Sequence, residues 1–243
     1  MLFDFGLLVI SIMAGGVASI TGFGIGSLIT PVLSLAIGTK LAVAVVSIPH
    51  LIATAIRFAM LRSHVDRRVL LGFGLMSLVG ALTGALLHTK FAAPALTMVF
   101  GLILLFAGFM GVSGLSERIR FHGALAWIAG AVSGFLGGLV GNQGGIRSAA
   151  LLGANISKES FVATATAIGL MVDAARMPVY FWSESEGMLM HGKWIAISAL
   201  GVVVGTLLGT KLLKRLAERA FRRTVSALIF LLGAFMFYKG VSR

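Results

Sequence analysis

Hydrophobic stretches long enough to cross a membrane recur along the whole chain, separated by short polar or basic links. They fall at about 5–37, 41–61, 69–88, 94–113, 122–153, 160–182, 193–213 and 222–240. A helix of about 20 apolar residues crosses a hydrocarbon layer of roughly 30 Å. Six stretches suit one such helix, while the first and fifth are longer and rich in glycine. The pattern predicts an all-α polytopic membrane protein.

The two halves of the chain repeat each other. The motif GxxxGxLLxTK occurs at 80–90 and again at 201–211, and each half has one long hydrophobic stretch followed by three shorter ones. Internal duplication of this kind is typical of secondary transporters, in which the binding site lies between the repeats. We therefore expect two transmembrane repeats, 1–120 and 121–243, within one membrane domain.

The charge of the links predicts that the repeats are inverted. Three arginines lie between 62 and 68, whereas the equivalent link in the second half carries Glu184 and Glu186. The next link has only Lys90, whereas its equivalent, 211–223, is strongly basic. Because basic links favour the cytoplasmic side, equivalent links are expected to face opposite sides.

The same rule predicts how the two long stretches cross. If all eight stretches were single spans, the basic links at 62–68 and 211–223 would face opposite compartments. If the fifth enters and leaves on one side, both links become cytoplasmic. A continuous helix of about 32 residues would also be about 48 Å long, too long for a bilayer without strong tilt. We predict two glycine-broken helical hairpins and six spans, with both termini outside; eight plain spans are the alternative.

The glycine-rich breaks of the two long stretches are a candidate substrate site. Glycine adopts the backbone angles of a broken helix, and half-helix N-termini attract anions. The predicted site glycines are Gly22, Gly24, Gly26, Gly141, Gly144 and Gly145. The neighbouring side chains predicted to orient the ligand are Thr21, Ser27, Asn142 and Gln143, and Arg147 is predicted to balance its charge. Close helix packing is the alternative, and it is the favoured interpretation of Gly15, Gly16, Gly80, Gly84, Gly201 and Gly205.

A polar stripe is repeated on two equivalent helices. Ser47, His50, Thr54 and Arg57 share one helix face, and the second half has Thr166, Gly169, Asp173 and Arg176 at the same places. Ionisable residues inside a membrane usually face a cavity or a partner. We therefore predict that the stripes face inward and that both arginines contact the substrate.

Two residues of the stripes are candidates for proton coupling, namely His50 and Asp173. An ion pair of Asp173 with Arg176, and a structural hydrogen bond of His50, are the alternatives. Snorkelling toward the membrane surface is the alternative for Arg57 and Arg176. Pro178 is expected to kink or end its helix.

Composition excludes several classes of protein. The net charge is +12, but basic residues are concentrated in the links of a chain that is 58% apolar, so nucleic-acid binding is not expected. The chain has no cysteine, which excludes disulfides and thiolate chemistry. No HExxH or P-loop motif is present, and we predict neither an enzyme nor a metal or cofactor site.

Three sequence patterns resemble a known family. They are Gly15…Gly22-Phe23-Gly24-x-Gly26…Pro31-Val32-Leu33, the pair Thr39-Lys40, and a second glycine block at 134–145. The chain thereby resembles the sulfite exporter TauE/SafE family over nearly its whole length. The resemblance implies a bacterial cytoplasmic-membrane transporter for small anions such as sulfite, sulfonates or sulfoacetate. The family usually has a proline-leucine pair after the second block, whereas this chain has Ala149-Ala150-Leu151, which indicates a subgroup with its own substrate.

Together these patterns predict a secondary transporter, expected to be an exporter, that moves a small anion by alternating access between two hairpin tips. A passive anion channel on the same repeats is the first alternative. A membrane assembly protein without transport is the second. The expected partners are the anion and the lipid bilayer, and homo-oligomerisation is left open.

Overall fold

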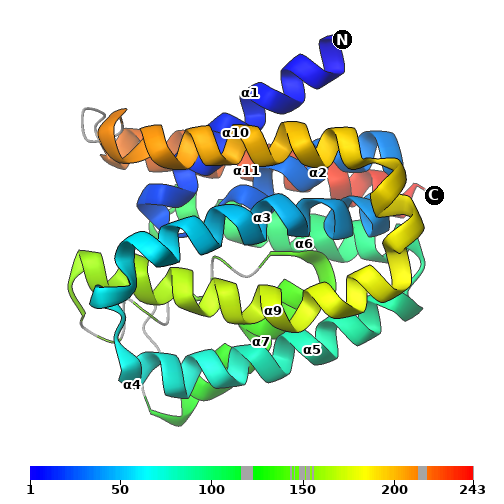
Figure 1. Cartoon of the computed structure of the whole chain (residues 1–243). Helices are drawn as coiled ribbons and strands as arrows, with labels where there is room; N and C mark the ends of the chain where they lie inside the picture. Colours follow the sequence, from blue (N-terminus) through cyan, green and yellow to red (C-terminus); the bar gives the residue numbers. More distant parts are fainter. Residues whose placement is uncertain are drawn as a thin grey trace.

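The computed structural model describes residues 1–115, 123–142, 144, 146–147, 151, 154, 156–212 and 218–242. All regular structure in these residues is helical (Figure 1). The helices are α1 (Leu2–Thr21), α2 (Ile25–Ile37), α3 (Thr39–Leu61), α4 (Arg67–Val69), α5 (Leu75–Lys90), α6 (Ala93–Val112), α7 (Ala124–Val140), α9 (Lys158–Met190), α10 (Gly192–Leu212) and α11 (Glu218–Val241).

Helices of membrane-spanning length make up most of the molecule. Among the described residues, six helical stretches are long and apolar enough to cross a membrane. Three shorter apolar helices, Ile25–Ile37, Ala124–Val140 and Val225–Val241, accompany them. The predicted all-α polytopic membrane fold is confirmed.

The first long stretch is a helical hairpin. It breaks between α1 and α2, where Gly22 and Gly24 have φ angles of 76° and 128°. Near the start of α1, Asp4 contacts Lys193 at the start of α10. The chain end of α2 leads directly into α3, and Leu41 there lies against Gly187, close to the same start of α10. The hairpin therefore enters and leaves at one end of the molecule, which we call the Glu184 end.

The second long stretch turns back in the same manner from the opposite end. At the start of α7, the Trp127 indole lies over Gly72, just after α4. α7 ends at Gly141, whose φ is 75°. At the start of α9, the Ser160 hydroxyl donates to the carbonyl of His64, again just before α4. This second hairpin therefore enters and leaves at what we call the Arg67 end.

Glycines bring two pairs of helices into backbone contact. A Cβ added to Gly84 of α5 would stand 2.1 Å from the carbonyl oxygen of Phe135 in α7. A Cβ added to Gly205 of α10 would stand 2.0 Å from the carbonyl oxygen of Ile12 in α1. Gly15, Gly80 and Gly201 are equally crowded, and Gly16 is part of the same contact as Gly205. The packing interpretation of these six glycines is confirmed.

The remaining long helices pair in antiparallel fashion. α6 packs along α11, with Gly101 against Phe237 and Gly108 against Phe230. α3 and α9 lie side by side at the centre and are the most buried of the spans (Figure 1). Four helices of the first half thus pack on helices of the second: α1 on α10, α3 on α9, α5 on α7 and α6 on α11. The repeat and its inversion stay predictions.

One boundary differs from the sequence prediction. α9 does not end near Pro178 but continues to Met190, and its helical geometry breaks only at Glu184, where φ is −127°. A proline removes one backbone hydrogen bond, and packing against neighbouring helices can outweigh that loss in a membrane protein. Arg176 consequently lies well inside a helix rather than near its end.

Candidate functional site

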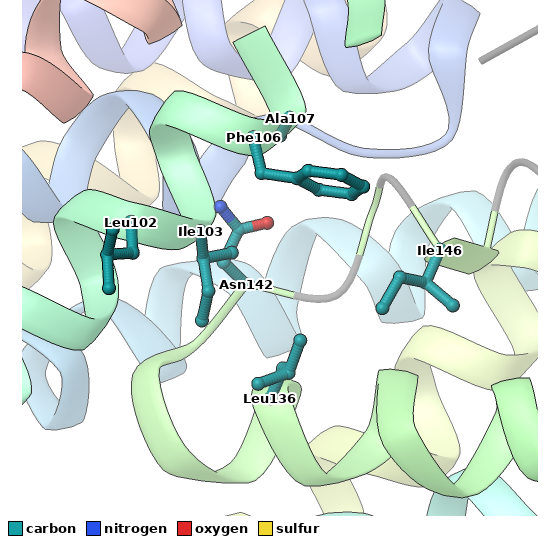
Figure 2. Close-up of a pocket in the computed structure, with 7 residues that line it drawn as sticks. All are labelled: Leu102, Ile103, Phe106, Ala107, Leu136, Asn142 and Ile146. Carbon is teal, nitrogen blue, oxygen red and sulfur yellow. The ribbon is translucent and has the colours of Figure 1, made fainter. Parts of the chain in front are cut away.

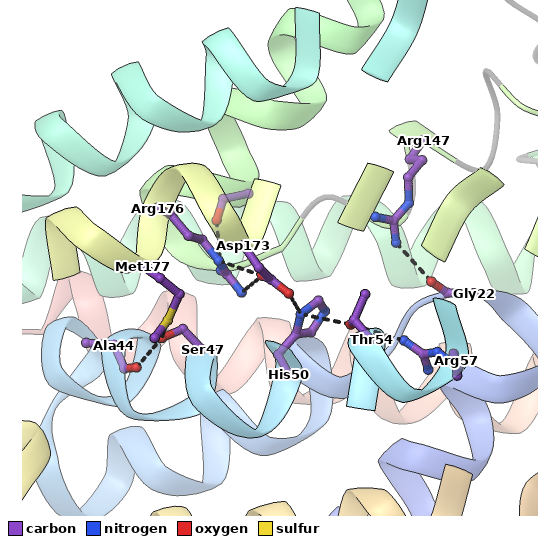
Figure 3. Close-up of polar contacts among 11 residues, drawn as sticks. Gly22, Ala44, Ser47, His50, Thr54, Arg57, Arg147, Asp173, Arg176 and Met177 are labelled. Atoms are coloured by element: carbon purple, nitrogen blue, oxygen red, sulfur yellow. Dashed lines mark hydrogen bonds and ion pairs between the residues drawn. The ribbon is translucent and has the colours of Figure 1, made fainter. Parts of the chain in front are cut away.

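The two polar stripes face each other across the contact between α3 and α9. His50 Nδ1 lies 2.6 Å from one carboxylate oxygen of Asp173 (Figure 3). The other oxygen accepts from Arg176, with Nε at 3.0 Å and Nη2 at 2.8 Å. All three residues are buried. The Asp173–Arg176 pair that was one alternative therefore exists, and it shares its carboxylate with the histidine.

Arg176 also fastens the end of α7. Its Nη1 donates to the carbonyl of Gly137 at 3.0 Å, and the Tyr180 hydroxyl donates to Gly138. His88 Nδ1 donates to the next carbonyl, Leu139, at 2.7 Å. Three consecutive carbonyls of the second hairpin are therefore held by side chains of α9 and α5.

Sequence reasoning missed two of these three residues. Tyr180 lies one helical turn after Arg176, so extending the polar stripe by one step would have included it. His88 occupies a variable position of the GxxxGxLLxTK motif, where the second copy has Gly209. That difference between the copies was the available signal.

Arg147 links the two hairpins. It is only 2% exposed, and its Nη2 donates to the carbonyl of Gly22 at the tip of the first hairpin at 2.9 Å (Figure 3). Its Nε and Nη1 are buried and have no hydrogen-bond partner in the part of the chain that the structure describes. The guanidinium therefore has donors to spare in the interior.

Arg57 is the second arginine with spare donors. Its Nη2 lies 3.4 Å from the Thr54 hydroxyl, while its buried Nε and Nη1 have no partner among the described residues. At 4% exposed, Arg57 does not snorkel, and neither does Arg176 at 2%. That alternative is wrong because both side chains point between the central helices rather than toward the membrane surface.

The guanidiniums of Arg57 and Arg147, which both have unpartnered donors, lie near the same position of α9. A Cβ built on Gly169 would stand 3.2 Å from Arg147 Nη1 and 3.5 Å from Cγ2 of Thr54. The hydroxyl of that threonine contacts Arg57. The stripe positions of α3 and α9 and the second hairpin therefore meet where Gly169 has no side chain.

The hairpin tips touch each other beside this place. A Cβ on Gly26 would stand 2.4 Å from the carbonyl oxygen of Gly141, and the Phe23 ring lies against Gly144. α2 begins at Ile25, so its first backbone N–H groups lie at this contact. The predicted glycines Gly22, Gly24, Gly26, Gly141 and Gly144 are thus brought together, whereas Gln143 and Gly145 lie outside the described residues.

The polar side chains predicted at the tips differ in what they contact. The Thr21 hydroxyl lies 3.0 Å from the Val17 carbonyl and 2.8 Å from that of Phe23, so it is satisfied within its own hairpin. Ser27 is buried. Asn142 is buried and its Nδ2 has no partner among the described residues.

Asn142 faces a small pocket between α6 and the second hairpin (Figure 2). The pocket has a volume of about 180 Å³ and is lined by Leu102, Ile103, Phe106, Ala107, Leu136, Asn142 and Ile146. With one amide among apolar side chains, it offers no charge to an anion. Ile146 lines this pocket, while the side chain of the next residue, Arg147, reaches the carbonyl of Gly22 instead.

The described residues contain no group of histidine and acidic side chains placed to hold a metal ion. A family model described as sulfite exporter TauE/SafE matches residues 7–236, nearly the whole chain. No curated protein and no solved structure gives a significant match.

Proposed function

Because the chain belongs to the sulfite exporter TauE/SafE family and is a multi-pass membrane protein, we propose that it exports a small anion by alternating access. The family supports an anion exporter rather than an enzyme. The observation that carries the proposal is the pair of buried guanidiniums, Arg57 and Arg147, whose Nε and Nη1 have no partner in the described residues.

Buried guanidiniums with unpartnered N–H groups favour the binding of an anion. Removing a charged group from water without a partner costs several kcal/mol. Guanidinium donors match the oxygens of carboxylate, sulfonate and sulfite groups. An anion held between Arg57 and Arg147 would satisfy both guanidiniums. The absence of a side chain at Gly169 lets the Arg147 guanidinium approach the backbone of α9 there.

The hairpin tips would complete the site. The first N–H groups of α2 are unpaired within the helix and carry partial positive charge. Gly24 and Gly26, at the start of α2, would offer backbone donors to the anion. Gly22, Gly141 and Gly144 would shape the contact between the tips, because the N–H groups of Gly22 and Gly141 already donate to the carbonyls of Ala18 and Gly137. Ser27 and Asn142 would orient it, Asn142 through its unpartnered Nδ2. Thr21 would act only after its hydroxyl leaves the carbonyls of its own hairpin.

Arg176 and Asp173 would serve the site mainly by position and by proton coupling. Arg176 is engaged with both Asp173 and Gly137, so it would hold the second hairpin in place. The hydrogen bond between His50 and Asp173 joins an imidazole to a carboxylate, two groups that can exchange a proton. We assign proton coupling to this pair.

Alternating access is supported by the way the hairpins meet. They enter from opposite ends, and Arg147 of one donates to Gly22 of the other. A substrate bound at that contact is well placed to be exposed to either end as one half moves against the other. We propose that residues 1–120 and 121–243 are inverted repeats and that these halves move against each other.

The Arg67 end is assigned to the cytoplasm of a bacterial inner membrane. Arg62, Arg67 and Arg68 lie exposed there, while Glu184 and Glu186 lie at the other end with both chain termini. This arrangement follows the positive-inside bias. The basic residues between 211 and 223, which bear on the same assignment, have side chains outside the described set.

The test is export from proteoliposomes loaded with sulfite, sulfonates or acetate-like acids. Arg147→Ala is expected to abolish flux, because it removes a guanidinium from the site. The matched control Arg67→Ala, at an exposed arginine, is expected to leave it unchanged. Full transport by Arg147→Ala, with normal gel filtration and thermal unfolding, would refute the site. Uphill accumulation driven by a pH gradient separates a carrier from a passive channel.

A further inference from the structure

The buried charges of the central cluster do not balance. Three arginines lie there with side chains almost fully buried: Arg57, Arg147 and Arg176. One carboxylate, Asp173, faces them, and it is already paired with Arg176. With His50 neutral, the cluster carries two more positive than negative charges.

No other carboxylate among the described side chains supplies the missing charge. The chain has eight acidic residues. Asp4 pairs with Lys193, Glu184 pairs with Lys40, and Asp66 caps α4 by accepting from the backbone of Val69. Glu159 and Glu186 are exposed, at the first turn and the final turns of α9. Glu117 and the Glu218 side chain lie outside the described set.

We propose that the site selects divalent anions, with one negative charge for Arg57 and one for Arg147. This inference rests on the proposed function and deepens it by naming the charge class of the substrate. The transported species carries two negative charges and enters while His50 is neutral. The central cluster is then electrically balanced when loaded.

The placement of the two guanidiniums is the physical basis of this selectivity for divalent anions, which we call the charge rule. Arg57 belongs to α3 and Arg147 to the second hairpin, and they approach Thr54 and Gly169 from different elements. An anion with oxygens on two sides bridges them. A monovalent anion of the same size neutralises one guanidinium and leaves the other buried and unpaired, which is strongly unfavourable.

The experiment compares probes that differ in charge but hardly in size. Sulfate is paired with methanesulfonate, in which a methyl group replaces one oxygen, and sulfoacetate is paired with 2-hydroxyethanesulfonate. Purified protein is titrated with each probe at constant ionic strength in gluconate, and Kd is obtained from the thermal shift. The wild type is expected to bind the divalent member of each pair at least about tenfold more tightly.

Charge-removing variants then test which arginines set the preference. Arg57→Gln and Arg147→Gln are tested separately. Each is expected to lower the ratio of divalent to monovalent affinity toward one, while the monovalent probes still bind. Arg67→Gln, at the exposed arginine, is expected to keep the wild-type ratio. Two variants are used so that failure of one to fold leaves the other informative.

Each outcome decides a different statement. Equal Kd values for both members of each pair in the wild type overturn the charge rule and leave the anion exporter intact. A ratio unchanged in both Arg57→Gln and Arg147→Gln also overturns the rule, because other groups would then set it. Absence of binding of all four probes, together with absence of flux, overturns the proposed function itself.

Discussion

Removing the negative charge of Asp173 is expected to lower the free energy of unfolding strongly. Its side chain is fully buried, and it accepts from Arg176 at 2.8 and 3.0 Å and contacts His50 at 2.6 Å. Asp173→Asn keeps the size but leaves the guanidinium of Arg176 without its counter-charge. Removing one partner of a buried ion pair typically costs about 3–5 kcal/mol, and we expect a loss of unfolding free energy in that range.

Substitution of the partner, Arg176→Gln, and the double variant complete a double-mutant cycle. Arg176→Gln leaves Asp173 paired with His50, which can take up a proton, so we expect its cost near the lower end, about 3 kcal/mol. The double variant removes both charges together. It is expected to be less destabilised than the sum of the single variants by about 1–3 kcal/mol.

The assay is equilibrium unfolding in SDS, followed by the fluorescence of the three tryptophans. The matched control is the ion pair of Lys40 with Glu184, at 3.7 Å and with side chains 28% and 19% exposed. Because water reaches that pair, its coupling energy is expected to be below about 1 kcal/mol. If the Asp173–Arg176 cycle is additive within about 0.5 kcal/mol, the two residues do not form the buried pair on which the reasoning rests.

Two further predictions concern packing and topology. Gly84→Ala places a methyl 2.1 Å from a carbonyl of α7 and is expected to destabilise by about 1–3 kcal/mol, whereas Gly6→Ala, with nothing within 4 Å, is expected to be neutral or slightly stabilising in the same SDS unfolding assay. Equal effects of the two would contradict the helix contact. Single cysteines replacing the exposed Arg67 and Glu186 should be labelled from opposite sides in oriented membranes, which the absence of native cysteine makes simple to measure. Labelling of both from one side would refute the assigned topology.

The sequence was sufficient for the spans and the hairpins because both follow from one-dimensional rules. Apolar length fixes which stretches can cross a bilayer, and the basic links at 62–68 and 211–223 could share a side only if segment five turned back. The packing glycines were also predictable, since the motif GxxxG has few other uses in an apolar helix.

The partners of the arginines were beyond sequence reasoning. Helical spacing placed Arg57 and Arg176 on inward faces, but it could not show that one is paired with a carboxylate while the other has spare donors. That difference depends on how α3 and α9 are set against each other and on which carbonyls α7 presents. The course of α9 through Pro178 was missed for a similar reason, because neighbouring helices stabilise a segment that local propensity disfavours.

The glycine contact between α1 and α10 has a consequence for biosynthesis. α1 is made before α10, and the helix that its glycine face fits, the segment 192–212, leaves the ribosome only after residues 22–191 have been made. Until then that face meets lipid or a temporary neighbour. Translation of the segment 192–212 therefore completes the packing of α1, although the residues of the tip contact are made earlier.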